Sequence, residues 1–292
     1  MRTHSYVRVA VLVVSAALPW TASAQDASQP AVSTASPIPA QIDETIVNLP
    51  TTLPLKEHAS YFRLTHRFAR DLRRGSFGDL AQDLFSLDNG AIIGLEYRYG
   101  ITRTLQAGVH RSIFNKAIVA FGRWDAWAQT EGRPYALSFG GGIEGNNNLR
   151  QDYQPAASAT VSHTHGDRLA VYATPTYVHK AHTDTLLELH EGHQHDTPEL
   201  EGGGDARDTF FLGLGARVRL RPTAYIVFEA SPRLAGYKPD RAAWNAGIEK
   251  MTHGHVLQLN FGNNFDTTPG ELARGGDKHN VYMGFNISRK FW

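Results

Sequence analysis

The sequence predicts an all-β protein, a single antiparallel transmembrane β-barrel of about twelve strands. Three observations predict it. The chain begins with an export signal. From residue 59 onward, segments of about ten residues alternate apolar and polar side chains. The links between these segments alternate between short and long. Together they describe a chain that is exported and then crosses a membrane with strands.

Residues 1–24 have the three parts of a secretory signal peptide. Arg2 and Arg8 give a positive start, an apolar run covers residues 10–18, and an A-x-A cleavage pattern ends at Ala24. The run is too short to span a bilayer as a helix, which takes about 20 apolar residues. We therefore expect cleavage after Ala24 and a mature chain without a transmembrane helix.

Composition argues against several classes of protein. There is no cysteine, which excludes a disulfide scaffold, a thiolate metal site and a cysteine nucleophile. The formal charge is +1, and it falls to −1 when the two arginines of residues 1–24 are removed. A nearly neutral chain argues against nucleic acid as a partner.

Residues 25–58 are rich in proline, serine, threonine and alanine and have no steady period. Such a composition is typical of a flexible linker. We expect this part to be a flexible periplasmic N-terminal segment that leads into a barrel formed by residues 59–292.

The barrel region contains twelve predicted strands. Apolar residues recur at every second position, as expected of strands with one face in an apolar environment. A short helix is expected around residues 77–85, in the first long loop. The predicted strands cover approximately 59–69, 89–99, 103–112, 116–129, 133–144, 153–164, 168–180, 208–220, 223–233, 243–252, 255–265 and 280–291.

The links between the strands predict the orientation of the barrel. Tight turns at 100–103, 130–133, 165–168, 221–223 and 252–254 alternate with longer links, apart from a short link at 113–115. Bacterial outer-membrane barrels have short periplasmic turns and longer extracellular loops. We therefore expect the barrel to lie in outer-membrane lipid with both termini on the periplasmic side.

The two faces of the strands predict what surrounds the barrel and what fills it. In a membrane barrel the apolar face meets lipid and the polar face lines the lumen. Arg123 and Asp125 belong to the inward set, and the main candidates for lumen-lining residues are Arg63, Arg67, Glu96, Arg98, Arg217, Arg219, Glu229 and Glu249. Two interpretations stay open, a water-filled passage that favours anions and a salt-bridge lattice that seals the lumen.

The last strand carries a candidate assembly signal. Phe285, Ile287 and Phe291 share its apolar face, and Trp292 ends the chain. An apolar strand with a final aromatic resembles the C-terminal signal of bacterial outer-membrane barrels. The resemblance implies the barrel-assembly machinery as a partner.

A wider resemblance covers the chain from about Leu49 to its end. The stretches LTHRFARD, DLFSLDNGAIIGLEYRYGITRTLQAGVHRSIFNK and VYMGFNISRKFW are similar to a family of predicted bacterial outer-membrane β-barrel proteins of unknown function. The resemblance implies a fold and a location, and it implies no activity.

The loop at 181–207 holds a candidate metal site. His190, His193 and His195 are closely spaced there, and imidazole is a ligand for zinc, copper and nickel. The alternative is a solvated loop of biased composition. We expect no other cofactor.

Enzyme chemistry has one candidate residue. His66 lies on the apolar face of the first strand and could serve as a base in a lipid hydrolase or acyltransferase, but no G-x-S-x-G motif occurs. We therefore expect a barrel without enzyme activity, with a narrow channel for small polar or anionic solutes as the leading function. The alternatives are an accessory barrel whose His-rich loop binds metal or a partner, and a lipid-modifying enzyme.

Overall fold

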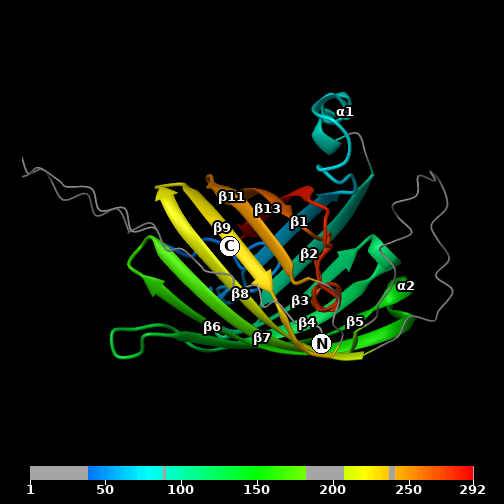
Figure 1. Cartoon of the computed structure of the whole chain (residues 1–292). Helices are drawn as coiled ribbons and strands as arrows, with labels where there is room; N and C mark the ends of the chain where they lie inside the picture. Colours follow the sequence, from blue (N-terminus) through cyan, green and yellow to red (C-terminus); the bar gives the residue numbers. More distant parts are fainter. Residues whose placement is uncertain (1–38, 88–89, 182–206, 237–240, 292) are drawn as a thin grey trace, which may run out of the picture. The chain divides into compact units, whose positions relative to one another are not determined.

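The computed structural model describes residues 39–87, 90–181, 207–236 and 241–291, which form a closed antiparallel barrel of twelve strands (Figure 1). Each wall strand pairs with its neighbours in sequence. The first strand, β1, also pairs with the last, β13, which closes the sheet. A closed sheet leaves no unpaired strand edge in lipid.

Every predicted strand corresponds to one strand of the wall. The ninth is divided at Pro232 into β9 and a short β10, which both pair with β8. The strands are β1 (Ser60–Phe68), β2 (Ala91–Gly100), β3 (Leu105–Ser112), β4 (Ile118–Trp127), β5 (Ala136–Gly145), β6 (Gln151–His165), β7 (Leu169–Ala181), β8 (Arg207–Arg221), β9 (Ala224–Ser231), β10 (Arg233–Ala235), β11 (Ala243–Met251), β12 (His255–Gly262) and β13 (Tyr282–Phe291).

Burial alternates along the strands as a membrane barrel requires. In β13, Asn286 and Ser288 are buried inside, whereas Ile287 between them is 37% exposed on the outer surface. The same alternation leaves leucine, isoleucine and aromatic side chains exposed around the outside of the wall. This outer surface suits lipid, and the polar side chains face the lumen.

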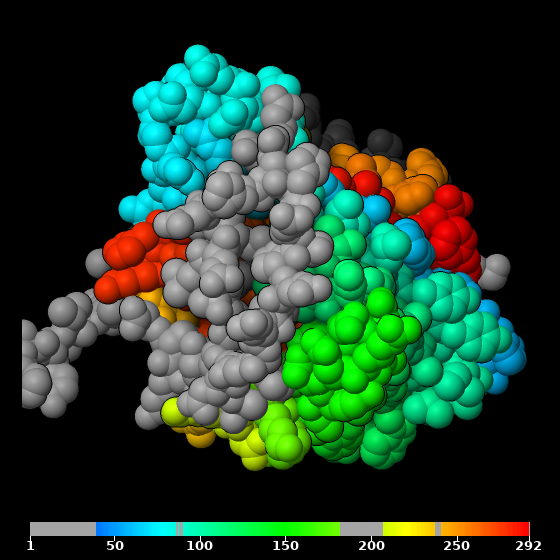
Figure 2. All heavy atoms as spheres, turned by 90° about the vertical axis from the view of Figure 1, so that its right-hand side faces the viewer, coloured from blue at the N-terminus to red at the C-terminus, as the bar shows by residue number. Residues whose placement is uncertain are grey.

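The first long loop contains the short helix that the sequence predicts. Helix α1 (Phe77–Gln82) begins at Ser76, whose hydroxyl accepts from the backbone N–H of Asp79 while the Asp79 carboxylate accepts from that of Ser76. Helix α1 stands clear of the barrel wall (Figures 1 and 2). A single helical turn at Leu84–Ser86 follows α1 in the same loop, whereas helix α2 (Asn146–Leu149) and a single turn at Phe114–Lys116 occupy other links.

Among the described residues, no helix is long and apolar enough to cross a membrane.

Helix α3 (Pro269–Arg274) lies inside the barrel, where it packs against β6, β7 and β8. Thr268 caps its first turn together with Glu271, and proline stands at its first position. Five of its six residues are buried. The loop between β12 and β13 therefore folds into the lumen.

The lumen also holds the described part of the N-terminal segment. Residues 39–55, which we call the plug, include Ile46 and Val47 with no exposed surface. A flexible periplasmic segment over 25–58 is expected from the sequence, and for residues 39–55 the structure corrects this expectation. The plug lacks a steady period because it is a tight hairpin, closed by hydrogen bonds from Ile46 N–H to Leu49 O (2.8 Å) and from Thr51 N–H to Glu44 O (2.9 Å).

Candidate functional site

The eight predicted lumen-lining residues all lie on the inward faces of their strands, and seven of them are buried. Arg219 is the partly exposed one, and it pairs with Asp167 in the turn before β7. Four of the others, Arg63, Arg67, Arg217 and Glu229, contact the plug directly. The predicted charges therefore surround a segment that was expected outside the barrel.

Glu229 on β9 holds the tip of the plug hairpin. Its carboxylate accepts from three consecutive backbone N–H groups, those of Val47 (3.1 Å), Asn48 (2.9 Å) and Leu49 (3.0 Å). Asn245 on β11 donates to the same carboxylate at 3.1 Å. Hydrogen bonds to a charged acceptor are stronger than neutral ones, which makes Glu229 the principal anchor of the hairpin tip.

Three of the eight predicted lumen-lining residues are arginines that donate hydrogen bonds to the plug. Arg63 donates to Val47 O (2.9 Å), and Arg67 donates to the Asn48 side chain (2.9 Å). Arg217 donates to Thr45 O at 2.7 Å while it also forms a two-point pair with Glu249 on β11, at 2.6 and 3.0 Å.

Strand β13 adds contacts to the start of the plug. Asn286 donates to Val47 O (3.0 Å), and Ser288 donates to the Asp43 carboxylate (2.7 Å). Lys290 lies 2.9 Å from Glu44, which also pairs with Arg123 at 3.2 Å. Burial opposes ionisation of Glu44, but these cations outweigh it and lower the pKa of its carboxyl below the ordinary value.

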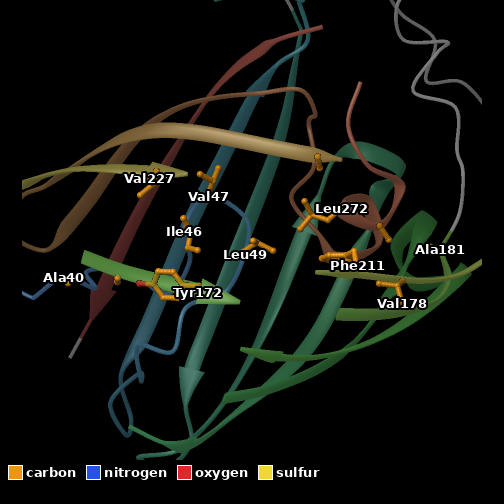
Figure 3. Close-up of a cluster of buried hydrophobic side chains, with 13 residues drawn as sticks. Ala40, Ile46, Val47, Leu49, Tyr172, Val178, Ala181, Phe211, Val227 and Leu272 are labelled. Atoms are coloured by element: carbon orange, nitrogen blue, oxygen red, sulfur yellow. The ribbon is translucent and has the colours of Figure 1, made fainter. Parts of the chain in front are cut away.

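Apolar packing completes the docking of the plug. Ile46, Val47 and Leu49 lie in one cluster with Tyr172, Phe211, Val227 and Leu272 (Figure 3). Two lumen-facing glycines of β8 leave room for them, because an added Cβ at Gly213 would lie 2.7 Å from Leu49 Cδ2, and one at Gly215 would collide with Ile46 Cδ1.

The inward loop carrying α3 is held by polar contacts. Glu144 accepts from Gly270 N–H at 3.0 Å, and Nε2 of His110 lies 3.2 Å from the Thr267 hydroxyl. Burial and the nearby carboxylate of Glu271 raise the pKa of Asp266 well above its ordinary value.

A cavity of about 130 Å³ lies between the plug, this loop and the wall formed by β1 to β7. On one side its lining residues are small, because β5 and β6 present glycine, alanine, serine and threonine there. Three arginines and two glutamates also line it: Arg63, Arg98, Arg123, Glu96 and Glu144.

The other predicted residues lie away from the lumen. His66 is on the outer surface, where its ring stacks on Phe285 (centroids 4.8 Å apart) and contacts Phe68 (4.4 Å). Within the described residues its side chain makes no hydrogen bond to a serine or a carboxylate, so a nucleophile–base pair is not assembled at His66.

The remaining predictions concern the chain end and one loop. Phe285, Ile287 and Phe291 face outward on β13, and their role in assembly stays a prediction. Trp292, His190, His193 and His195 lie outside the described residues. In the part of the chain that the structure describes, no group of three or more histidine or acidic side chains could hold a metal ion.

The plug, the inward loop and the contact made by Lys290 are not among the features predicted from the sequence. Two features of the sequence mark the plug in retrospect. Apolar residues cluster at Ile46, Val47 and Leu49 within an otherwise polar stretch, and glycines recur at inward positions of β8. The inward loop carries a capping pattern at Thr268–Glu271.

The sequence matches a family model described as a membrane bound beta barrel domain (DUF5777) over residues 43–291. The chain therefore belongs to this family and is a membrane-bound β-barrel protein. The match begins at Asp43, so the plug hairpin is part of the family's domain. No curated protein matches the sequence.

Solved bacterial outer-membrane proteins are similar in structure. The NanC porin has 8% identity and a TM-score of 0.49, with 80% of this chain and 99% of that chain covered. The COG4313 outer membrane channel from Pseudomonas putida F1 has 12% identity and a TM-score of 0.47, covering 86% and 100%. The KdgM porin has 8% identity and a TM-score of 0.44, covering 80% and 98%.

Proposed function

We propose that the protein is an outer-membrane channel for small polar and anionic solutes and that its plug closes most of the lumen. We further propose that both termini are periplasmic, so that the plug enters from that side. The observation that carries the proposal is the cavity beside the plug.

The shape of the lumen supports a passage on one side of the barrel. The plug contacts β8, β9, β12, β13 and β1, and it also reaches β4 through Arg123 and β6 through Thr52. Beside these contacts, β5 and β6 present small side chains such as Gly140, Gly142 and Ala156 to the lumen. A water molecule needs only about 10–15 Å³ of such space. A cavity of about 130 Å³, whose lining is mainly apolar but carries three arginines and two glutamates, therefore has room for several waters.

The charges of the cavity support a preference for anions. Its lining arginines outnumber its lining glutamates, and basic linings favour anions in pores. When the plug undocks, its ionic contacts with the wall are exchanged for contacts with water, so the net free energy of docking is only a fraction of the gross interaction. Conductance is therefore expected to rise when the plug is released.

Single-channel recording tests the proposal. Refolded mature protein is inserted into planar bilayers under a potassium chloride gradient, with Glu229→Gln as the variant and Glu57→Gln as the control. Glu57 is partly exposed and lies outside the plug. We expect small anion-preferring steps from the wild type and from Glu57→Gln, and larger or more frequent steps from Glu229→Gln. Silence from all three proteins, shown to be folded by heat-modifiable gel migration, would refute the channel.

A further inference from the structure

Arg98 is a buried lumen arginine that makes no hydrogen bond to the plug, unlike Arg63, Arg67, Arg123 and Arg217. Its Nε donates to Glu96 Oε1 at 2.6 Å. Among the described residues, its two terminal nitrogens have no hydrogen-bond partner. The side chain is 5% exposed and lines the cavity. A buried guanidinium with two free N–H-bearing nitrogens is unusual, since buried charges are normally paired through most of their donors.

Two aromatic rings clamp this guanidinium in place. Its Cζ lies 5.4 Å from the ring centre of Tyr61 and 5.1 Å from that of Phe121. Tyr61 is the direct cross-strand partner of Arg98 on β1, and Phe121 belongs to β4, two strands away on the other side. Both contacts are cation–π interactions, which strengthen when the cation is desolvated.

Gly108 makes the second contact geometrically feasible. It is the partner of Arg98 on β3 and of Phe121 on β4. A Cβ at Gly108 would lie 2.5 Å from Cζ of Phe121. The absence of a side chain there lets the Phe121 ring reach across β3 toward Arg98.

The neighbouring acids leave the terminal nitrogens of Arg98 unoccupied. Glu96 divides its two oxygens between Nε of Arg98 and the Arg63 guanidinium at 2.9 Å. The plug carboxylate of Glu44 is paired with Arg123 and Lys290. Glu96 therefore orients the Arg98 guanidinium through Nε, and the two terminal nitrogens remain available on the side of the cavity that Arg98 lines.

We propose that this clamped arginine is a binding site for a small organic carboxylate. The inference rests on the proposed channel and names the class of solute that it would carry. A planar guanidinium offers two parallel N–H donors that match the two oxygens of a carboxylate. An apolar body on the ligand would lie against Phe121, Gly142 and Ala156, which continue the same cross-strand row and line the cavity.

The test measures binding directly, so that it does not depend on conductance. Full-length mature protein, refolded in detergent, is titrated with trifluoroacetate and followed by fluorine NMR. Trifluoroacetamide serves as the neutral analogue of the same shape. Arg98→Gln removes the site, Arg98→Lys keeps the charge without the fork, and Gly108→Ala displaces Phe121 and keeps the arginine. Arg111→Gln, on the outward face of β3, is the matched control.

We expect wild type and Arg111→Gln to bind trifluoroacetate and to ignore the amide. Arg98→Gln should bind it roughly 10- to 150-fold more weakly, the range for hydrogen bonds to a charged group. Arg98→Lys and Gly108→Ala should fall between these limits. Because Gly108→Ala retains every charge, it tests the clamp even if Arg98→Gln fails to fold.

Three outcomes overturn the inference. Arg98→Gln could bind trifluoroacetate as tightly as the wild type, or Arg111→Gln could lose as much affinity as Arg98→Gln. The third is that the folded wild type does not bind trifluoroacetate at millimolar concentration. Failure of the channel proposal is distinguishable, because carboxylate binding that depends on Arg98 in a barrel without conductance would leave the site standing. Conductance without such binding would leave the channel standing and remove the site.

Discussion

Replacing Glu229 with glutamine should release the tip of the plug. The carboxylate accepts from the N–H groups of Val47, Asn48 and Leu49. Glutamine keeps one oxygen and presents an NH₂ group where the second oxygen stood, so that donors face donors. Hydrogen bonds to charged groups contribute about 1.5–3 kcal/mol each. Allowing for the acceptor that remains, we expect docking to weaken by about 2–4 kcal/mol.

The expected change in population follows from this free energy. Each 1.4 kcal/mol is a factor of ten, so the undocked fraction of the plug should rise roughly 30- to 700-fold. Amide hydrogen exchange measures that fraction, because exchange requires local opening. The amides of residues 44–51 should exchange faster by that factor in Glu229→Gln, while those of the wall strands keep their rates.

Glu57→Gln is the control, since its carboxylate is outside the plug contacts. Unchanged exchange over residues 44–51 in Glu229→Gln would refute the reasoning, because it would mean that Glu229 does not hold the hairpin. Equal acceleration in the wall strands would refute it differently, by showing that Glu229 supports the barrel as a whole.

Three further predictions concern the plug and the inward loop. Thr52 Oγ1 and Ser162 Oγ are 2.5 Å apart, which brings their Cβ atoms within reach of a disulfide. Thr52→Cys with Ser162→Cys should therefore cross-link on mild oxidation in this cysteine-free chain, and free thiols by mass spectrometry would contradict the docked position. Neighbouring cations lower the pKa of Glu44. The contribution of its carboxylate to docking is therefore present at neutral pH and is lost as the pH falls through and below about 4. Glu44→Gln should weaken docking at neutral pH and flatten this acid dependence, as measured by amide exchange. The pKa of Asp266 is raised. The contribution of this carboxyl to docking of the inward loop is therefore strongest below about pH 4 and weakens as the pH rises from there. Asp266→Asn should slow amide exchange in the loop at neutral pH, and a pH profile of exchange identical to that of the wild type would contradict this.

The sequence predicts the wall well because the wall has a local signal. A strand between lipid and a polar lumen must alternate at every second residue, and β13 does so from Tyr282 to Ser288. The inward positions of Arg63, Arg98 and Arg217 follow from the same period. The partners of these arginines do not follow from the alternation, because the alternation assigns a side chain to one face of the strand and does not say which residue it contacts.

The plug lacks such a signal because its contacts are distant in sequence. Val47 meets Glu229 at a separation of 182 residues. A short hairpin rich in proline and threonine has the composition of a linker until the charges that receive it are known. The clamp at Arg98 depends on the space left by Gly108, which is a property of packing across three strands.

The plug also bridges the line along which the barrel closes. Arg63 and Arg67 on β1 and Asn286 and Ser288 on β13 all hold it, and these two strands are the first and last of the sheet. The plug thus links β1 and β13 across the seam at which the barrel closes. Contacts at separations of up to 245 residues are slow to form, so we expect the seam to gain this reinforcement after the wall strands have paired. If the plug undocks as proposed, the seam loses these contacts, so we expect opening of the lumen and loosening of the seam to be coupled.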